Sequence, residues 1–124
     1  MIVAAVDNSG STYNYRHYYK DHVFKVLSKI QGPVRVILWT NQVLSDITHD
    51  KIDSIDKIFS HDPHGKTEPQ SFFKVLPTKV PIDLYIFTDG EIWDADVENC
   101  LKHRKEQKIE FSHVNLYYIG EKNV

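Results

Sequence analysis

The segment that decides the fold reads IVAAVDNSGS and runs from Ile2 to Ser11. Its first half is short, apolar and led by β-branched residues, which is typical of a central parallel strand covered on both faces. Its second half places the carboxylate of Asp7 just before the hydroxyls of Ser9 and Ser11. Hard divalent cations prefer oxygen ligands of this kind. The segment therefore predicts a buried strand with an oxygen-rich site at its carboxyl end.

A second apolar run that leads into an acidic residue follows much later in the chain. The apolar run LYIF, residues 84–87, leads directly into Thr88, Asp89 and Gly90. In open α/β sheets, ligands bind beyond the carboxyl ends of the strands, near the point where the strand order reverses. Because Asp7 and Asp89 both follow apolar strands, we expect the two carboxylates to lie at the same edge of the sheet.

Helical and strand patterns alternate along the rest of the chain. Strands are predicted over residues 2–6, 34–40, 82–88 and 114–119, with a short return strand at the sheet edge over 43–47. Helices are predicted over residues 12–30, from a cap at Thr48 or Asp50 to 59, from Pro69 to 76, and over 94–105. The last of these helices carries Val97 and Leu101 one turn apart. The segment from Ser60 to Pro69 is rich in turn-forming residues and is predicted as a loop.

This alternation of strands and helices predicts an α/β fold. The expected architecture is a three-layer sandwich in which a mostly parallel central sheet has helices on both faces. A length of 124 residues fits one domain, so we expect a single domain over residues 1–124.

Composition and charge exclude several function classes. The net charge of −2 gives no support for nucleic-acid binding, which depends on clustered Lys and Arg. No apolar run approaches the ~18 residues that a membrane span requires, and no signal peptide is recognised at the N-terminus. Cys100 is the single cysteine, which rules out an internal disulfide and fits a reducing compartment. We therefore expect a cytoplasmic, intracellular protein without nucleic-acid or membrane partners.

Three motifs together resemble the metal-ion-dependent adhesion site (MIDAS) of von Willebrand factor A (VWA) domains. Asp7, Ser9 and Ser11 match the Asp-x-Ser-x-Ser motif of that family. Residues 65–67 (GKT) resemble its Gly-Gly-Thr loop, and residues 88–90 (TDG) match its Thr-Asp-Gly motif. The order and spacing of the motifs agree with the family over nearly the whole chain. The resemblance implies a Rossmann-like VWA fold, with about five to six strands.

The resemblance also implies a function and a set of site residues. Ser9, Ser11 and Thr67 would contact a Mg²⁺ or Mn²⁺ ion directly, while Asp7 and Asp89 would hold its waters and the serine hydroxyls. With few anionic ligands the ion stays electrophilic, and an acidic group of a partner protein can fill its open position. The implied function is a non-catalytic, metal-dependent protein-binding module.

The chain departs from the family pattern at two places. Lys66 replaces the usual middle glycine beside the threonine, and we expect its long side chain to extend into solvent because a cation pointing inward would repel the metal. Beyond residue 120 most VWA domains continue through a further helix and strand, so the chain resembles a minimal or C-terminally shortened variant. An uncovered edge strand invites pairing with another chain. Self-association or docking through the strand at 114–119 is therefore a hypothesis.

An enzyme is the main alternative, because DNSGS after a strand also resembles the opening motif of haloacid-dehalogenase-type phosphatases. In that hypothesis Asp7 attacks phosphorus with the help of magnesium. The other roles would fall to a small set of side chains: Asp89 or Asp94 for the metal, Ser60 for the phosphate, and Lys66 or Lys79 for the charge. Those phosphatases usually carry a second Asp where this chain has Ser9, and Thr67 would have no role.

Three further interpretations stay open. The domain could be an interaction module whose metal site has decayed. The hydroxyls after Asp7 could simply form a turn that caps the following helix. His61 and His64 are close in sequence, but no cysteine or third histidine lies at ligand spacing, so a zinc pattern is incomplete.

Overall fold

The computed structural model describes residues 1–90 and 94–119, and a central sheet organises them. The sheet has five strands in the order β3-β2-β1-β4-β5. The strands are β1 (Ile2–Asp7), β2 (Val34–Trp39), β3 (Val43–His49), β4 (Ile82–Thr88) and β5 (Phe111–Tyr118). The helices are α1 (Arg16–Leu27), α2 (Gln70–Phe73) and α3 (Asp94–Gln107), with 3₁₀ helices η1 (Gly10–Tyr15) and η2 (Ile55–Lys57). Residues 91–93 and 120–124, and with them the expected chain end beyond the last strand, lie outside the described residues.

The pairing of the strands confirms the mostly parallel sheet. β1 pairs in parallel with β2 on one side and β4 on the other, and β4 pairs in parallel with β5. β3 is the antiparallel return strand at the edge, and it is longer than predicted. The order of strands reverses direction between β1 and β4, which places the expected ligand-binding crevice at the carboxyl ends of these two strands.

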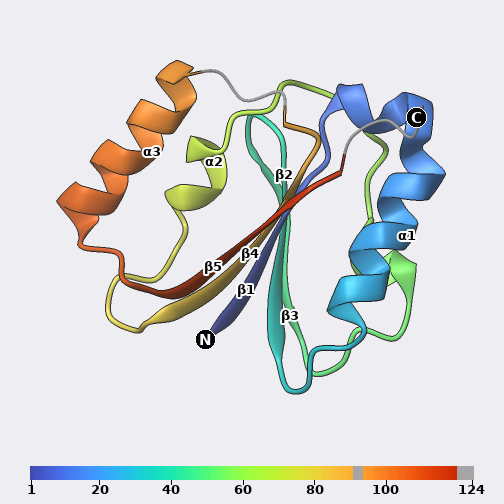
Figure 1. Cartoon of the computed structure of the whole chain (residues 1–124), viewed down its shortest axis with the longest axis horizontal. Helices are drawn as coiled ribbons and strands as arrows, with labels where there is room; N and C mark the ends of the chain where they lie inside the picture. The colour runs from blue at the N-terminus through green and yellow to red at the C-terminus, as the bar shows by residue number, and fades with distance from the viewer. Residues whose placement is uncertain (91–93, 120–124) are drawn as a thin grey trace.

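Helices cover both faces of the sheet, as predicted. Figure 1 shows α1 on one side of the sheet and α2 and α3 on the other. β1 contributes to both cores, because Ala4 and Val6 pack with the α1 side while Val3 and Ala5 pack with the α2 side. All four side chains are completely buried. This two-sided burial is the reason for the uninterrupted apolar run that opens the sequence.

The predicted helix up to residue 59 is wrong. β3 continues to His49, and Thr48 pairs with Arg35 in the ladder, so the residue expected to cap a helix lies inside a strand. Only the short η2 forms afterwards, where the Ser54 hydroxyl accepts a hydrogen bond from the Asp56 backbone N–H at 3.3 Å. Ile52, Ile58 and Phe59 are nevertheless buried against the α1-side core. The apolar residues were therefore identified correctly and their conformation was not.

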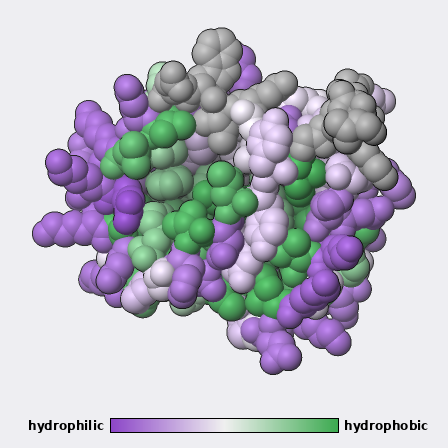
Figure 2. Space-filling model, viewed as in Figure 1, coloured by the Kyte–Doolittle hydropathy of each residue, from purple (hydrophilic) through white to green (hydrophobic). Residues whose placement is uncertain are grey.

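The helices at 70 and 94 also differ from expectation. α2 has only four residues. α3 forms at the predicted place, but Val97 and Leu101 are exposed and Cys100 is the buried side chain. α3 packs against α2, and Figure 2 shows hydrophobic side chains exposed over it. In the described part of the chain, the helices lack the combination of length and hydropathy that crossing a membrane requires.

Candidate metal centre

Asp7 links the two strands that bring the sequence motifs together. It is the last residue of β1 and is completely buried. Its Oδ1 accepts a hydrogen bond from the Ser9 backbone N–H at 2.8 Å, and its Oδ2 accepts one from the Thr88 hydroxyl at 2.9 Å. The carboxylate therefore holds the loop after β1 against the end of β4.

The hydroxyls that follow Asp7 reach the second acidic residue. Ser9 Oγ and Ser11 Oγ lie 2.9 Å apart, within hydrogen-bonding distance. The Ser11 hydroxyl donates a hydrogen bond to the carboxylate of Asp89, which follows β4. Ser9 and Asp89 are both buried. Two motifs that are far apart in the sequence thus form one connected group of oxygens.

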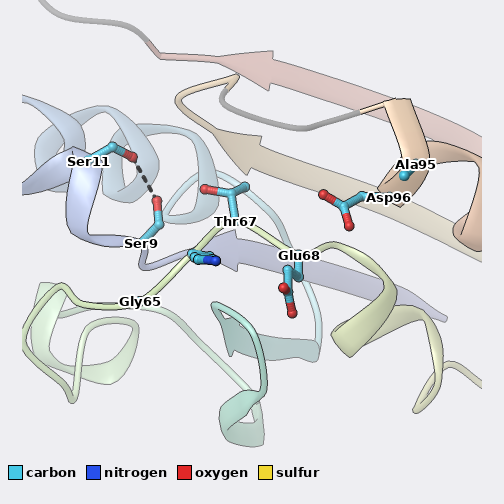
Figure 3. A pocket seen from close by; sticks show the side chains of 8 residues that line it. Ser9, Ser11, Gly65, Thr67, Glu68, Ala95 and Asp96 are labelled. Carbon is cyan, nitrogen blue, oxygen red and sulfur yellow. Dashed lines mark hydrogen bonds between the residues drawn. The ribbon is translucent and has the colours of Figure 1, made fainter.

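Thr67 completes this group from a third segment, the loop before α2. Thr67 lines the same pocket as Ser9 and Ser11, and the volume of this pocket is about 420 Å³. Figure 3 shows the Thr67 hydroxyl pointing towards the two serines. The residue as a whole is buried, with an exposed fraction of 5%. The structure therefore brings the five predicted side chains, Asp7, Ser9, Ser11, Thr67 and Asp89, to one end of the sheet.

Backbone contacts attach the Thr67 loop to the loop after β1. The His64 N–H donates to the Asn8 carbonyl at 3.1 Å, and the Gly10 N–H donates to the Gly65 carbonyl at 3.0 Å. Gly65 has φ of 79°, and an added Cβ would lie 3.2 Å from Thr40 Oγ1. A side chain at this position would be strained and crowded, so glycine suits the close approach of this loop to the residues that follow β2.

Asn8 and Arg16 reinforce this attachment, and neither stands out in the sequence. The Asn8 side-chain amide donates to the Asp62 carbonyl at 3.1 Å. Arg16 donates to the Asn8 side-chain oxygen and to the His61 carbonyl, and its guanidinium lies 4.8 Å from the centre of the Phe59 ring. Both residues donate to backbone carbonyls of a distant loop, those of Asp62 and His61, so no local spacing signals these contacts.

Tyr19 of α1 both packs in the core and supports the site. The residue is completely buried. Its hydroxyl donates to the backbone oxygen of Asp7 at 2.6 Å and lies 3.2 Å from that of Phe87. A buried carbonyl without a partner costs free energy. Tyr19 therefore supports the ends of β1 and β4 directly beneath the oxygen cluster.

Burial makes the charged form of Asp7 unfavourable. The pKa of Asp7 rises from 3.8 to about 6, first because the carboxyl is removed from water and also because the charge of Asp89 repels it. Hydrogen bonds from Ser9 and Thr88 oppose this rise only in part. A cation near both carboxylates would remove the repulsion. The repulsion between the two carboxylates favours a bound cation, and the set of hydroxyl and carboxylate oxygens suits Mg²⁺ or Mn²⁺.

The raised pKa predicts that the metal-free protein loses stability as the pH rises. The native state keeps a proton on Asp7 up to about pH 6, whereas the unfolded chain releases it near 3.8. Since the native state binds more protons in this window, its free energy of unfolding should fall by roughly 2–3 kcal/mol across it, at 1.36 kcal/mol per pKa unit. Urea unfolding in the presence of a chelator, at several pH values, measures this loss.

Asp7→Asn is the control for this pH dependence, because the amide does not titrate. The difference in unfolding free energy between the parent and this variant should therefore change between pH 4 and 6 as Asp7 ionises. A difference that stays constant with pH would show that Asp7 ionises normally in the native state.

Other residues considered in the sequence lie away from the oxygen cluster or at its rim. Lys66 lines the pocket and is exposed, as expected. Ser60 is exposed and contacts His61 Nδ1 at 3.0 Å, and Lys79 is exposed at the opposite, amino-terminal end of β4. The side chain of Asp94 lies outside the described residues.

A conventional zinc site has no counterpart in the structure. Over residues 1–90 and 94–119, no group of three or more His, Cys, Asp and Glu side chains is arranged to hold a metal ion. His61 and His64 are both exposed. The candidate centre differs from such a cluster because three of its five side chains carry hydroxyls and only two carry carboxylates.

Comparisons with known proteins support the fold. No family model and no curated protein matches the sequence. The structure is similar to the crystal structure of VWA2, a paralog of ArnB from Sulfolobus acidocaldarius, with a TM-score of 0.58 and 18% sequence identity. The match covers 96% of this chain and 34% of the other, so this chain spans about a third of that protein. The likeness shows a VWA-like α/β fold.

Proposed function

We propose that this VWA-like domain is a non-catalytic binding module that uses Mg²⁺ or Mn²⁺ to bind an acidic group on a partner protein. The observation that carries the proposal is the convergence of hydroxyls and carboxylates from three distant segments at one pocket. The Thr67 hydroxyl that faces the serines and the unfavourable charge of buried Asp7 both suit a cation at this place.

The site residues would divide into two groups around the ion. Ser9, Ser11 and Thr67 would contact it through their hydroxyls, while Asp7 and Asp89 would orient those hydroxyls and the waters of the ion. When bound, the ion supplies a positive centre that a carboxylate can approach from the pocket. The hydrogen bonds from Asp7 to the backbone of Ser9 and from Ser11 to Asp89 already order this group.

The walls of the pocket favour a partner that depends on the metal. Glu68 and Asp96 line the side away from the serines, and Figure 3 shows both carboxylates beyond Thr67. Together with Asp7 and Asp89 they would repel an acidic side chain when no cation is bound. Lys66 is a cation on this wall, but it is exposed and surface charges are strongly screened. We therefore expect affinity for an acidic partner to require the metal.

The environment of Asp7 supports binding over phosphoryl transfer. A carboxylate nucleophile must reach the substrate with an oxygen lone pair, and both Asp7 oxygens accept hydrogen bonds in a completely buried position. Ser60, which the phosphatase hypothesis assigns to the phosphate, does not line the pocket; of its two alternative lysines, Lys66 lines the pocket and Lys79 does not.

Calorimetric titration with Mn²⁺ tests the metal site. Ser9→Ala and Thr67→Val each remove one hydroxyl with little change in volume. Each should weaken Mn²⁺ binding by at least about 10-fold, because losing a direct ligand should cost no less than losing a group that only orients one. Ser60→Ala is the matched control, because it removes a loop hydroxyl outside the pocket and should leave the affinity unchanged. The titration should extend to millimolar Mn²⁺, since affinity without the partner is expected to be weak.

Two results would contradict the proposal in different ways. Equally negligible heats for the parent and all variants would indicate a decayed site. Turnover of a generic aryl phosphate in the presence of magnesium, abolished by Asp7→Asn, would indicate the phosphatase instead.

A further inference from the structure

Among the described residues, β5 is an edge strand of the sheet. It pairs only with β4 among the described strands and lies at the end of the strand order. The Ile119 N–H donates to the Thr88 carbonyl, so the alternate residues Val114, Leu116 and Tyr118 direct their backbone N–H and C=O groups away from β4. These groups are available to a further strand.

The usual protection of edge strands is missing from β5. Proteins protect edges with charged side chains, prolines or bulges that prevent pairing. Residues 111–118 (FSHVNLYY) contain no Asp, Glu, Lys, Arg or Pro, although charged residues make up 26% of the chain. The single irregularity in its pairing lies at the start of the strand. The opposite edge, β3, carries Asp46 at its centre, in an ion pair with Arg35 at 2.6 Å.

An exposed apolar surface accompanies this open edge. Val114, Leu116 and Tyr118 are 54%, 64% and 69% exposed, and they share the face of the sheet on which α3 lies. Val97 and Leu101 of α3 are exposed as well. In Figure 2, hydrophobic side chains gather over α3 and beside β5 on this face of the molecule. Surfaces of this kind mark interaction sites.

We propose that two copies of this chain pair through their β5 edges, in antiparallel orientation, to form one continuous sheet. A two-fold axis perpendicular to the sheet keeps the apolar face of both copies on the same side. The Leu116 side chains of the two copies then lie directly or diagonally opposite each other, within cross-strand reach. No like charges meet in this pairing, because β5 carries no charged residue apart from a titratable His113.

The charge distribution along α3 favours a second copy of this chain, and not a strand of an unrelated protein, as the partner of β5. The first half of α3 carries Asp96 and Glu98, while its second half is net positive through Lys102, Arg104 and Lys105. The same two-fold axis makes the two α3 helices antiparallel, so the acidic half of each faces the basic half of the other. A specific interface buries about 800 Å² per partner, and a strand edge alone supplies less. The exposed apolar side chains of α3 therefore belong to the interface.

Sedimentation velocity over micromolar to millimolar protein concentrations, with a chelator present, tests the pairing independently of the metal site. The mass should rise from the 14.5 kDa of one chain towards twice that value. Leu116→Lys should weaken the dimer at least about tenfold, because like charges meet across the two-fold axis. Leu116→Glu should do the same. An equimolar mixture of the two variants should recover the dimer, since opposite charges then face each other.

Ile47→Lys is the matched control on the other edge. Ile47 is 52% exposed on β3, so the same substitution tests surface charge without altering β5. This variant should dimerise like the parent. A parent that stays monomeric at every concentration would overturn the proposal, and a strand of another protein would then be the alternative partner of β5. A dimer that survives Leu116→Lys, or one that is lost in Ile47→Lys, would also overturn it, as would a Lys and Glu mixture that stays monomeric.

Discussion

Gly90→Ala should lower the free energy of unfolding by about 2–4 kcal/mol, from backbone strain and overpacking together. Gly90 has φ of 88°, a conformation that costs a residue with a Cβ roughly 1–2 kcal/mol. An added Cβ would also lie 1.8 Å from a ring carbon of Tyr118, so the ring must move. Thermal or urea unfolding measures the loss. Because Gly90 follows Asp89 directly, the same change should disturb the hydrogen bond between Ser11 and Asp89.

Two variants separate the strain at Gly90 from the clash. Gly32 has φ of 93° and no atom within 4 Å of an added Cβ, so Gly32→Ala should show the strain alone, about 1–2 kcal/mol. Tyr118→Ala removes the ring that an added Cβ at position 90 would meet, and this side chain is mostly exposed. In the Tyr118→Ala background, Gly90→Ala should therefore lower the free energy of unfolding only by the amount of the backbone strain. Equal losses for Gly90→Ala and Gly32→Ala would show that the Tyr118 ring moves away without cost.

Phe72→Ala should lower the free energy of unfolding by about 3–5 kcal/mol, the usual range for a buried Phe. Phe72 is completely buried, and its ring lies 5.0 Å from the Trp39 ring. α2 has only four residues and cannot be stable without tertiary packing. Phe72 is therefore the anchor that fixes the segment after Thr67. Urea denaturation measures the loss, and Mn²⁺ affinity should fall in parallel if the anchor places Thr67.

Phe73→Ala is the control for this anchor. Phe73 is its neighbour in α2 but is only half-buried, so its truncation should cost clearly less and leave Mn²⁺ binding near that of the parent. A similar loss of stability in both variants would mean that α2 is held by its general apolar content and not by Phe72.

The sequence predicted the parts of the fold that have local signals. β1 and β4 are short apolar runs ended by Asp7 and Thr88-Asp89, and the structure contains both strands where they were predicted. Parallel strands end at the same edge, so the meeting of Asp7 with the Thr88-Asp89 segment follows from the fold class. The role of these residues as a metal site remains a prediction.

The failures occurred where long-range pairing overrode a local pattern. The spacing of Ile52, Ile55 and Ile58 suits a helix, but β3 extends to His49 in its pairing with β2, and only Ile55–Lys57 then form a 3₁₀ helix. In α3, packing on α2 buries Cys100 and leaves Val97 and Leu101, which lie one turn apart, exposed. A periodic pattern shows which residues share a face, and it does not show what that face contacts.

By itself, then, the sequence determined the positions of the strands, the acidic residues that end two of them, and the side chains that supply oxygens. Each of these depends on neighbours along the chain. Only the tertiary structure decided how the cluster is held and charged. Asn8 and Arg16 bind a distant loop, and Tyr19 spans two strand ends. The pKa of Asp7 depends on burial by the whole fold and on the nearby charge of Asp89. Such effects arise from groups that folding brings together across long stretches of chain, and no local pattern encodes them.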